Sequence, residues 1–79
     1  MKEKTNYNEI IRKIRLRKGW SQEKVCNELE KYDYHITRST YTKYESGIRR
    51  LSALTVEKLA RCFGVSADYI LGLNDDEYC

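Results

Sequence analysis

The chain has 79 residues, is 41% hydrophobic and 34% charged, and carries a formal net charge of +3, which allows one small globular domain and excludes a disordered, charge-rich chain. No apolar run approaches the roughly 20 residues of a membrane span, and residues 1–5 carry charge where a secretory signal needs an apolar segment. We therefore expect a cytoplasmic protein.

Five helices are predicted, because five stretches of helically spaced apolar residues each follow a residue with a good capping side chain. The expected helices lie near residues 7–18, 22–32, 38–46, 53–63 and 67–71. The capping residues are Asn6, Ser21, Thr37, Ser52 and Ser66, and glycines follow every helix except the second. No alternating strand pattern is present. The fold class is therefore all-α, a compact five-helix domain over residues 6–73 with short flexible tails at 1–5 and 74–79.

Each helix is expected to bury one stripe of side chains against a common core. The inward residues are Tyr7, Ile10, Ile11 and Ile14; Val25, Cys26, Leu29 and Tyr32; Tyr41, Tyr44 and Glu45; Val56, Leu59, Ala60 and Phe63; and Ile70 with Leu71.

The link between the second and third helices has no glycine, so another residue must take the left-handed turn conformation. Asp33 is the best candidate, because Asp tolerates that conformation better than most residues. Ile36 is expected to fill the core between the two helices. Of the neighbouring side chains, Tyr32 or Tyr34 is expected to pack over the third helix and His35 to lie in solvent. Contact of these side chains with a DNA backbone is the alternative.

The third expected helix presents an unusual outer face. If its inward residues point to the core, the outward ones are Arg38, Ser39, Thr42, Lys43 and Ser46. These five side chains provide two cations, three hydroxyls and no acid. Because Arg can bind guanine O6 and N7 and hydroxyls can reach several base edges, the face suits a DNA major groove. A solvated polar face is the alternative.

Basic residues surround this face in the sequence. Residues 1–58 contain 14 Lys and Arg against 8 Asp and Glu, whereas residues 59–79 contain one Arg against four acids. The basic body permits a polyanionic partner. Lys18, Arg49 and Arg50 are expected to contact phosphates, as is Gln22 at the N-terminus of the second helix, while the third helix reads sequence.

Three segments occur in a specific order: RLRKGWSQE at 15–23, TRSTYTKYESG at 37–47 and LARCFGVS at 59–66. Over roughly residues 7–73 they resemble the phage-repressor (Cro/XRE-type) helix-turn-helix family. The resemblance implies a lambda-repressor-like domain that binds a double-stranded DNA operator and regulates transcription, most simply as a repressor, at the nucleoid and without a cofactor.

The resemblance also implies roles for single residues. Arg38, Ser39 and Thr42 match base-reading positions, and Lys43 matches a groove position at the bases or phosphates. Gln22 matches a phosphate-contacting glutamine close to the bases. Arg15 and Glu45 match a structural ion pair, which has a physical reason because an inward carboxylate needs a partner. The alternative is that both side chains face water.

The chain departs from the family pattern in two places. Thr37 follows Leu29 by eight residues instead of three, so five residues are inserted and the tight turn between the two helices is in question. Tyr41 stands where the family usually has a β-branched aliphatic residue, which implies a locally remodelled core.

A homodimer is expected, because two heads about one helical turn (roughly 34 Å) apart would read a near-palindromic operator. The expected seam uses Leu71 and Leu73, with Leu54 as a further candidate, since Leu73 lies beyond the last glycine and has no clear role in the core. A monomer is the alternative.

The main alternative function is an antitoxin or adaptor whose principal partner is another protein. An enzyme is not expected, because the chain has one histidine and no triad, paired-carboxylate or phosphate-loop pattern. The three cysteines, at 26, 62 and 79, lack CxxC spacing, so no metal site and no disulfide is expected. Cys26 and Cys62 are instead expected to be buried thiols.

Overall fold

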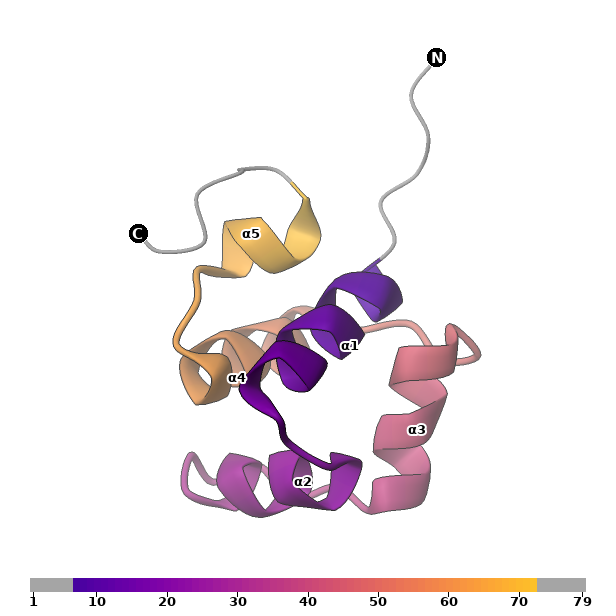
Figure 1. Ribbon diagram of the computed structural model, residues 1–79, viewed down its shortest axis with the longest axis vertical. Coiled ribbons are helices and arrows are strands. Elements are labelled where there is room, and N and C mark those ends of the chain that lie inside the picture. The colour runs from indigo at the N-terminus through magenta and orange to yellow at the C-terminus, as the bar shows by residue number, and fades with distance from the viewer. Residues whose placement is uncertain (1–6, 73–79) are drawn as a thin grey trace.

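The computed structural model describes residues 7–72, which form five helices and no strand (Figure 1). The helices are α1 (Tyr7–Lys18), α2 (Gln22–Glu30), α3 (Arg38–Ser46), α4 (Ala53–Phe63) and α5 (Ala67–Leu71). The all-α prediction is therefore confirmed. The expected tails and the expected cap Asn6 lie outside the described residues.

Side-chain caps determine where four of the helices begin. The hydroxyl oxygens of Ser21, Thr37, Ser52 and Ser66 each accept a hydrogen bond from the backbone N–H three residues later, at 3.0 to 3.1 Å. These four predicted caps are confirmed. α3 ends at Gly47, whose φ of 84° lies in the left-handed region that favours glycine. The Asn8 side chain lies 3.4 Å from the position that a Cβ at residue 47 would take.

α2 is shorter than predicted and ends at Glu30 rather than near residue 32. The backbone N–H groups of Lys31, Tyr32 and Asp33 bond to carbonyls three residues back, at 2.9 to 3.1 Å, and this tighter winding ends the helix. Asp33 then takes a φ of 62°, as predicted. The prediction that Tyr32 belongs to the inward stripe of α2 is wrong, because Tyr32 lies beyond the helix end and is exposed.

The link from α2 to α3 (residues 31–37) is attached to α4 at two points. The Tyr34 hydroxyl shares a hydrogen bond of 2.5 Å with Thr55 Oγ1. Lys58 Nζ donates to the backbone oxygen of Tyr32 at 2.8 Å. Tyr34 is thus the tyrosine that packs: its hydroxyl bonds to Thr55 on α4, and it also interacts with Tyr44 on α3. His35 is exposed as expected. The insertion therefore forms a strap held by α4 instead of a tight turn.

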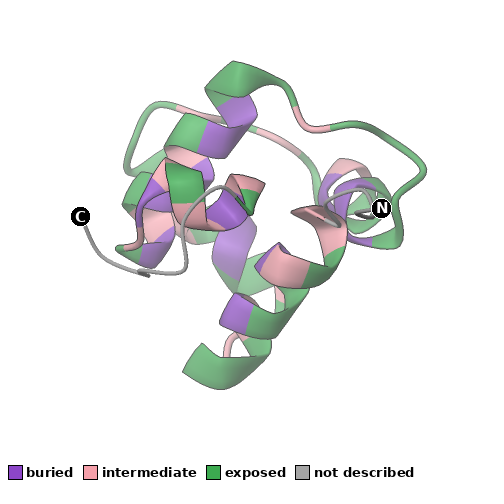
Figure 2. Ribbon diagram, turned by 90° about the horizontal axis from the view of Figure 1, so that it is seen from above, coloured by how far each residue is buried: buried purple, intermediate pink, exposed green. Residues whose placement is uncertain are grey.

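One core lies between the helices, and the buried residues lie on their facing sides (Figure 2). The buried hydrophobic residues are Ile11, Ile14, Val25, Cys26, Leu29, Tyr41, Tyr44, Val56, Leu59, Ala60, Phe63 and Ile70, with Ile36 and Leu71 packed partly buried against them. α3 contacts both α1 and α2, so its orientation is set from two sides. Tyr41 is completely buried in this core, as its place in the predicted inward stripe requires.

Candidate nucleic-acid interface

α3 turns a polar face to solvent. Tyr41, Tyr44 and Glu45 are buried, and the predicted division of the helix into two faces is confirmed. We call the five exposed residues the outward stripe: Arg38, Ser39, Thr42, Lys43 and Ser46. The outward stripe contains two cations and no carboxylate, so it is positively charged and rich in hydrogen-bond donors. Phosphates and guanine edges are the DNA groups that such a surface fits.

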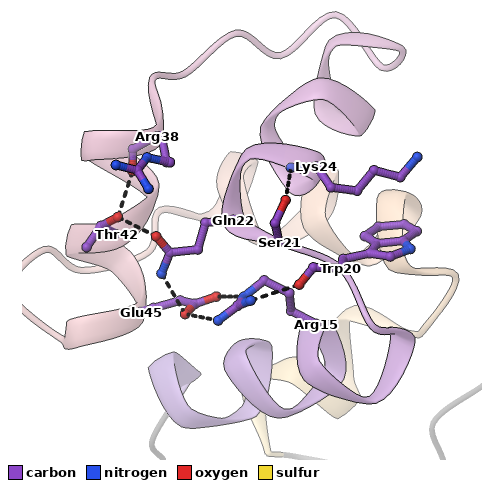
Figure 3. Close-up of polar contacts among 8 residues, drawn as sticks. All are labelled: Arg15, Trp20, Ser21, Gln22, Lys24, Arg38, Thr42 and Glu45. Carbon is purple, nitrogen blue, oxygen red and sulfur yellow. Dashed lines mark hydrogen bonds and ion pairs between the residues drawn. The ribbon is translucent and has the colours of Figure 1, made fainter.

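A bidentate ion pair holds the inward side of α3 against α1 (Figure 3). Arg15 Nε lies 2.6 Å from Glu45 Oε2, and Arg15 Nη2 lies 3.1 Å from Glu45 Oε1. Only 11% of the Arg15 side chain and 4% of the Glu45 side chain is exposed to solvent. Arg15 Nη1 donates to the backbone oxygen of Trp20 at 2.8 Å. The structure thus brings together the two residues that were expected to pair, and one guanidinium joins α1, the turn before α2 and α3.

Both members of this pair are charged at neutral pH. Burial acts to raise the pKa of Glu45, but hydrogen bonds, those from Arg15 foremost, outweigh burial and hold that pKa below its ordinary value of 4.5. The hydrogen bond to Glu45 raises the pKa of Arg15 in turn. Loss of one partner would leave the other charge largely shielded from water without a counterpart.

Gln22, the first residue of α2, joins the ion pair to the outward stripe (Figure 3). Its Nε2 donates to Glu45 Oε1 at 3.1 Å, and its Oε1 lies 2.7 Å from Thr42 Oγ1. Thr42 Oγ1 also lies 2.9 Å from the backbone oxygen of Arg38. Sequence reasoning expected Gln22 at a phosphate and missed this bridge. Gln22 lies 20 positions from Thr42 and 23 from Glu45 along the chain, so no local pattern could have indicated it.

The turn between α1 and α2 is built around Trp20. The centroid of the indole ring lies 6.0 Å from the centroid of the Phe63 ring. The Nζ atoms of Lys18 and Lys24 lie 5.2 and 5.6 Å from the indole centroid, within the range of cation–π attraction. Lys18, an expected phosphate contact, is thus exposed beside an aromatic ring. Sequence reasoning used Trp20 only as a part of its motif and missed this arrangement.

The two arginines expected at phosphates follow α3 directly and are exposed. The backbone N–H of Arg49 donates to the oxygen of Lys43 at 3.2 Å, which attaches this segment to the last turn of α3. Arg49 therefore lies next to the Lys43 end of the outward stripe, and Arg50 is the next residue along the chain.

Comparison with known proteins identifies this architecture. A family model described as helix-turn-helix matches residues 11–70. The chain belongs to this helix-turn-helix family. The resemblance to Cro/XRE-type proteins is therefore confirmed.

One relative of this helix-turn-helix chain is the "SPbeta prophage-derived uncharacterized HTH-type transcriptional regulator YonR" of Bacillus subtilis (strain 168). The two are 37% identical over 65 residues, which is 82% of this chain and 56% of the relative. The chain thus spans about half the length of the curated relative that it matches.

The expected seam of the helix-turn-helix domain is only partly covered by the described residues, because Leu73 lies outside them. Leu71 is partly buried, and Leu54 on α4 is 52% exposed. Leu71 also lines a hollow of about 380 Å³, whose other lining residues are Tyr7, Leu51, Ala53, Val56, Glu57 and Ala67. This surface near α5 and the start of α4 is largely apolar.

Within residues 7–72, no group of three or more His, Cys, Asp and Glu side chains is arranged to hold a metal ion. No helix in the same part of the chain combines the length and the apolar character needed to cross a membrane. Cys26 is buried and Cys62 is partly buried. Burial raises the pKa of both thiols, that of Cys62 to about 11, so both are protonated at neutral pH. Cys79 lies outside the described residues.

Proposed function

We propose that the chain is a sequence-specific, double-stranded DNA-binding transcriptional regulator that acts as a repressor in the cytoplasm and has no catalytic activity. The outward stripe is the observation that carries this proposal. It is a carboxylate-free, donor-rich surface on a helix that the Arg15–Glu45 pair holds from behind. A surface that is already ordered loses little conformational entropy on binding. The name of the Bacillus subtilis relative, a transcriptional regulator, supports the same function.

In this proposal the residues divide into two groups. The base-reading residues are Arg38, Ser39, Thr42 and Lys43, and the phosphate contacts are Lys18, Gln22, Arg49 and Arg50. The Gln22 amide has two hydrogens on Nε2, of which Glu45 takes one, and the second is directed to a phosphate oxygen.

The regulator acts as a homodimer in this proposal, because one small head contacts too few base pairs to select an operator. Two heads spaced by about one helical turn, roughly 34 Å, read a near-palindromic site. The exposure of Leu54 and the apolar hollow beside Leu71 support a seam at this end of the domain, with Leu73 as its further member.

Selection of bound fragments from a random duplex pool tests the proposal. We expect enrichment of a near-palindromic sequence, whose affinity falls by about 10³ between 50 and 200 mM salt if some six phosphates are contacted. Transcription from a promoter that overlaps this site should fall when the protein is added.

Two results would count against the proposal. An absence of enrichment together with an absence of duplex binding at low salt would reject DNA recognition. It would favour an antitoxin or adaptor whose partner is a protein. Higher transcription on binding would reject the repressor role alone.

A further inference from the structure

The orientation of the Gln22 side-chain amide is fixed by Glu45. An ionised carboxylate only accepts hydrogen bonds, so the amide must turn its NH₂ group toward Glu45 Oε1, 3.1 Å away. The opposite orientation would place two acceptor oxygens against each other. The atom of Gln22 that lies 2.7 Å from Thr42 Oγ1 is therefore the carbonyl oxygen Oε1. Figure 3 shows this chain of contacts from Arg15 to Thr42.

Thr42 therefore has two acceptors on its inner side and one proton to give them. The first acceptor is Gln22 Oε1, and the second is the backbone oxygen of Arg38 at 2.9 Å. Neither oxygen can donate, whereas a hydroxyl has one proton and two lone pairs. Whichever oxygen takes the proton, none remains for a group that approaches from outside. On its solvent-exposed side the Thr42 hydroxyl therefore offers only lone pairs, which accept hydrogen bonds.

We propose that Thr42 acts only as a hydrogen-bond acceptor and reads the exocyclic amino group of an adenine or a cytosine. In the major groove the donors are adenine N6 and cytosine N4, whereas guanine N7 and O6 and thymine O4 are acceptors. A threonine hydroxyl without inner partners can face either kind of edge. Here the Arg15–Glu45 pair fixes the Gln22 amide, and the amide in turn determines which kind of base edge Thr42 can contact. This inference rests on the proposed function and specifies one contact within it.

A double-mutant cycle on the selected duplex tests the inference. Wild-type protein and Thr42→Val, which keeps the shape but removes the hydroxyl, are each titrated with duplexes that lack one amino group at a time. Purine replaces adenine and pyrimidin-2-one replaces cytosine. We expect Thr42→Val to lose about 3- to 10-fold in affinity on the intact duplex, as for one neutral hydrogen bond. On one amino-deleted duplex the two proteins should bind equally.

Two controls accompany the cycle. Thr42→Ser retains the hydroxyl and should retain the coupling to the same amino group, which separates loss of the hydrogen bond from loss of packing. Duplexes containing 7-deazaguanine lack one acceptor each and should lower the affinity of wild type and Thr42→Val by the same factor.

The outcomes separate this inference from the proposed function. If wild type binds the selected duplex but Thr42→Val binds every probe as well as wild type does, the acceptor role is wrong and DNA binding stands. The same holds if the Thr42 hydroxyl couples to an N7 atom instead of an amino group. If wild type binds no duplex at low salt, both the proposed function and the acceptor role are wrong.

Discussion

At the scale of single residues, the buried carboxylate of Glu45 depends on hydrogen bonds from neighbouring side chains. Its carboxylate accepts two hydrogen bonds from Arg15 and one from Gln22, with 4% of the side chain exposed. Glu45→Gln should lower the free energy of unfolding by about 3 kcal/mol at neutral pH, because the guanidinium loses its counter-charge in a poorly solvated place. Urea denaturation measures the change. Glu57→Gln, which breaks an exposed i,i+4 pair with Arg61, is the matched control and should have little effect.

The same pair predicts a pH dependence. The pKa of Glu45 is lower in the folded chain than its ordinary value of 4.5. Its stabilising contribution is therefore complete above that value and is lost as the pH falls through the folded-state pKa. The difference between wild type and Glu45→Gln should shrink below pH 4.5. A difference that stays constant down to the acid transition would contradict the assignment.

Removal of the hydroxyl group can be compared at two tyrosines, Tyr41 and Tyr34, whose hydroxyls have different surroundings. The buried Tyr41 hydroxyl makes no hydrogen bond of good geometry within residues 7–72, although it lies close enough to Glu45 to help lower the pKa of that carboxyl. The Tyr34 hydroxyl, in contrast, bonds to Thr55. Tyr34→Phe should lower the free energy of unfolding by about 1 kcal/mol, and Tyr41→Phe, which removes a hydroxyl without a hydrogen bond of good geometry, should lower it by less. Equal losses in thermal denaturation would show that Tyr41 has a partner after all.

Arg38 and Arg50 separate the two kinds of DNA contact proposed above. Arg38→Ala should cost about 1–3 kcal/mol of binding and relax the preference at one base pair. Arg50→Ala should weaken binding to all sequences alike and reduce the slope of log affinity against log salt by about 1. Competition titrations at several salt concentrations distinguish these results. An equal loss on every sequence for Arg38→Ala would remove it from the base-reading residues.

At the scale of the elements, the strap over residues 31–37 depends on one backbone conformation. Asp33 has a φ of 62°, which β-branched residues adopt only with strain. Asp33→Val should therefore lower the free energy of unfolding by about 1–3 kcal/mol, while Asp33→Gly should be tolerated. Chemical denaturation of both variants, with His35→Val as the exposed neighbouring control, checks this. Equal stability of the Val and Gly variants would place the turn elsewhere.

The helices also show which features of the fold could be predicted from the sequence and which could not. Hydroxyl caps and apolar spacing act within one or two turns, so the starts of α2 to α5 and the inward position of Glu45 follow from the sequence. The end of α2 does not, because no glycine marks it and the strap is held by Lys58 and Thr55 from another helix. The bridge through Gln22 was likewise inaccessible, because it depends on how α1, α2 and α3 meet in space.

At the scale of the whole molecule, the proposed dimer gives a direct measurement. The Leu54 side chain is 52% exposed near an apolar hollow, so a charge at this position should oppose association without disturbing the core. Sedimentation at micromolar concentration should show a dimer for wild type and a monomer for Leu54→Glu. Leu16→Glu, at an equally exposed leucine on α1, is the control and should remain dimeric. A single 9.4 kDa species for wild type would reject the dimer in free solution.

The guanidinium of Arg15 bonds at once to α3 and to the turn before α2. In the proposed complex, a helix fastened in this way meets the duplex as a stiff template that resists rotation into an imperfect groove. Any mismatch in shape must then be absorbed by bending or twisting of the DNA, whose energy depends on the base steps being deformed. The preferred site should therefore include bases that no side chain touches, chosen for their flexibility alone.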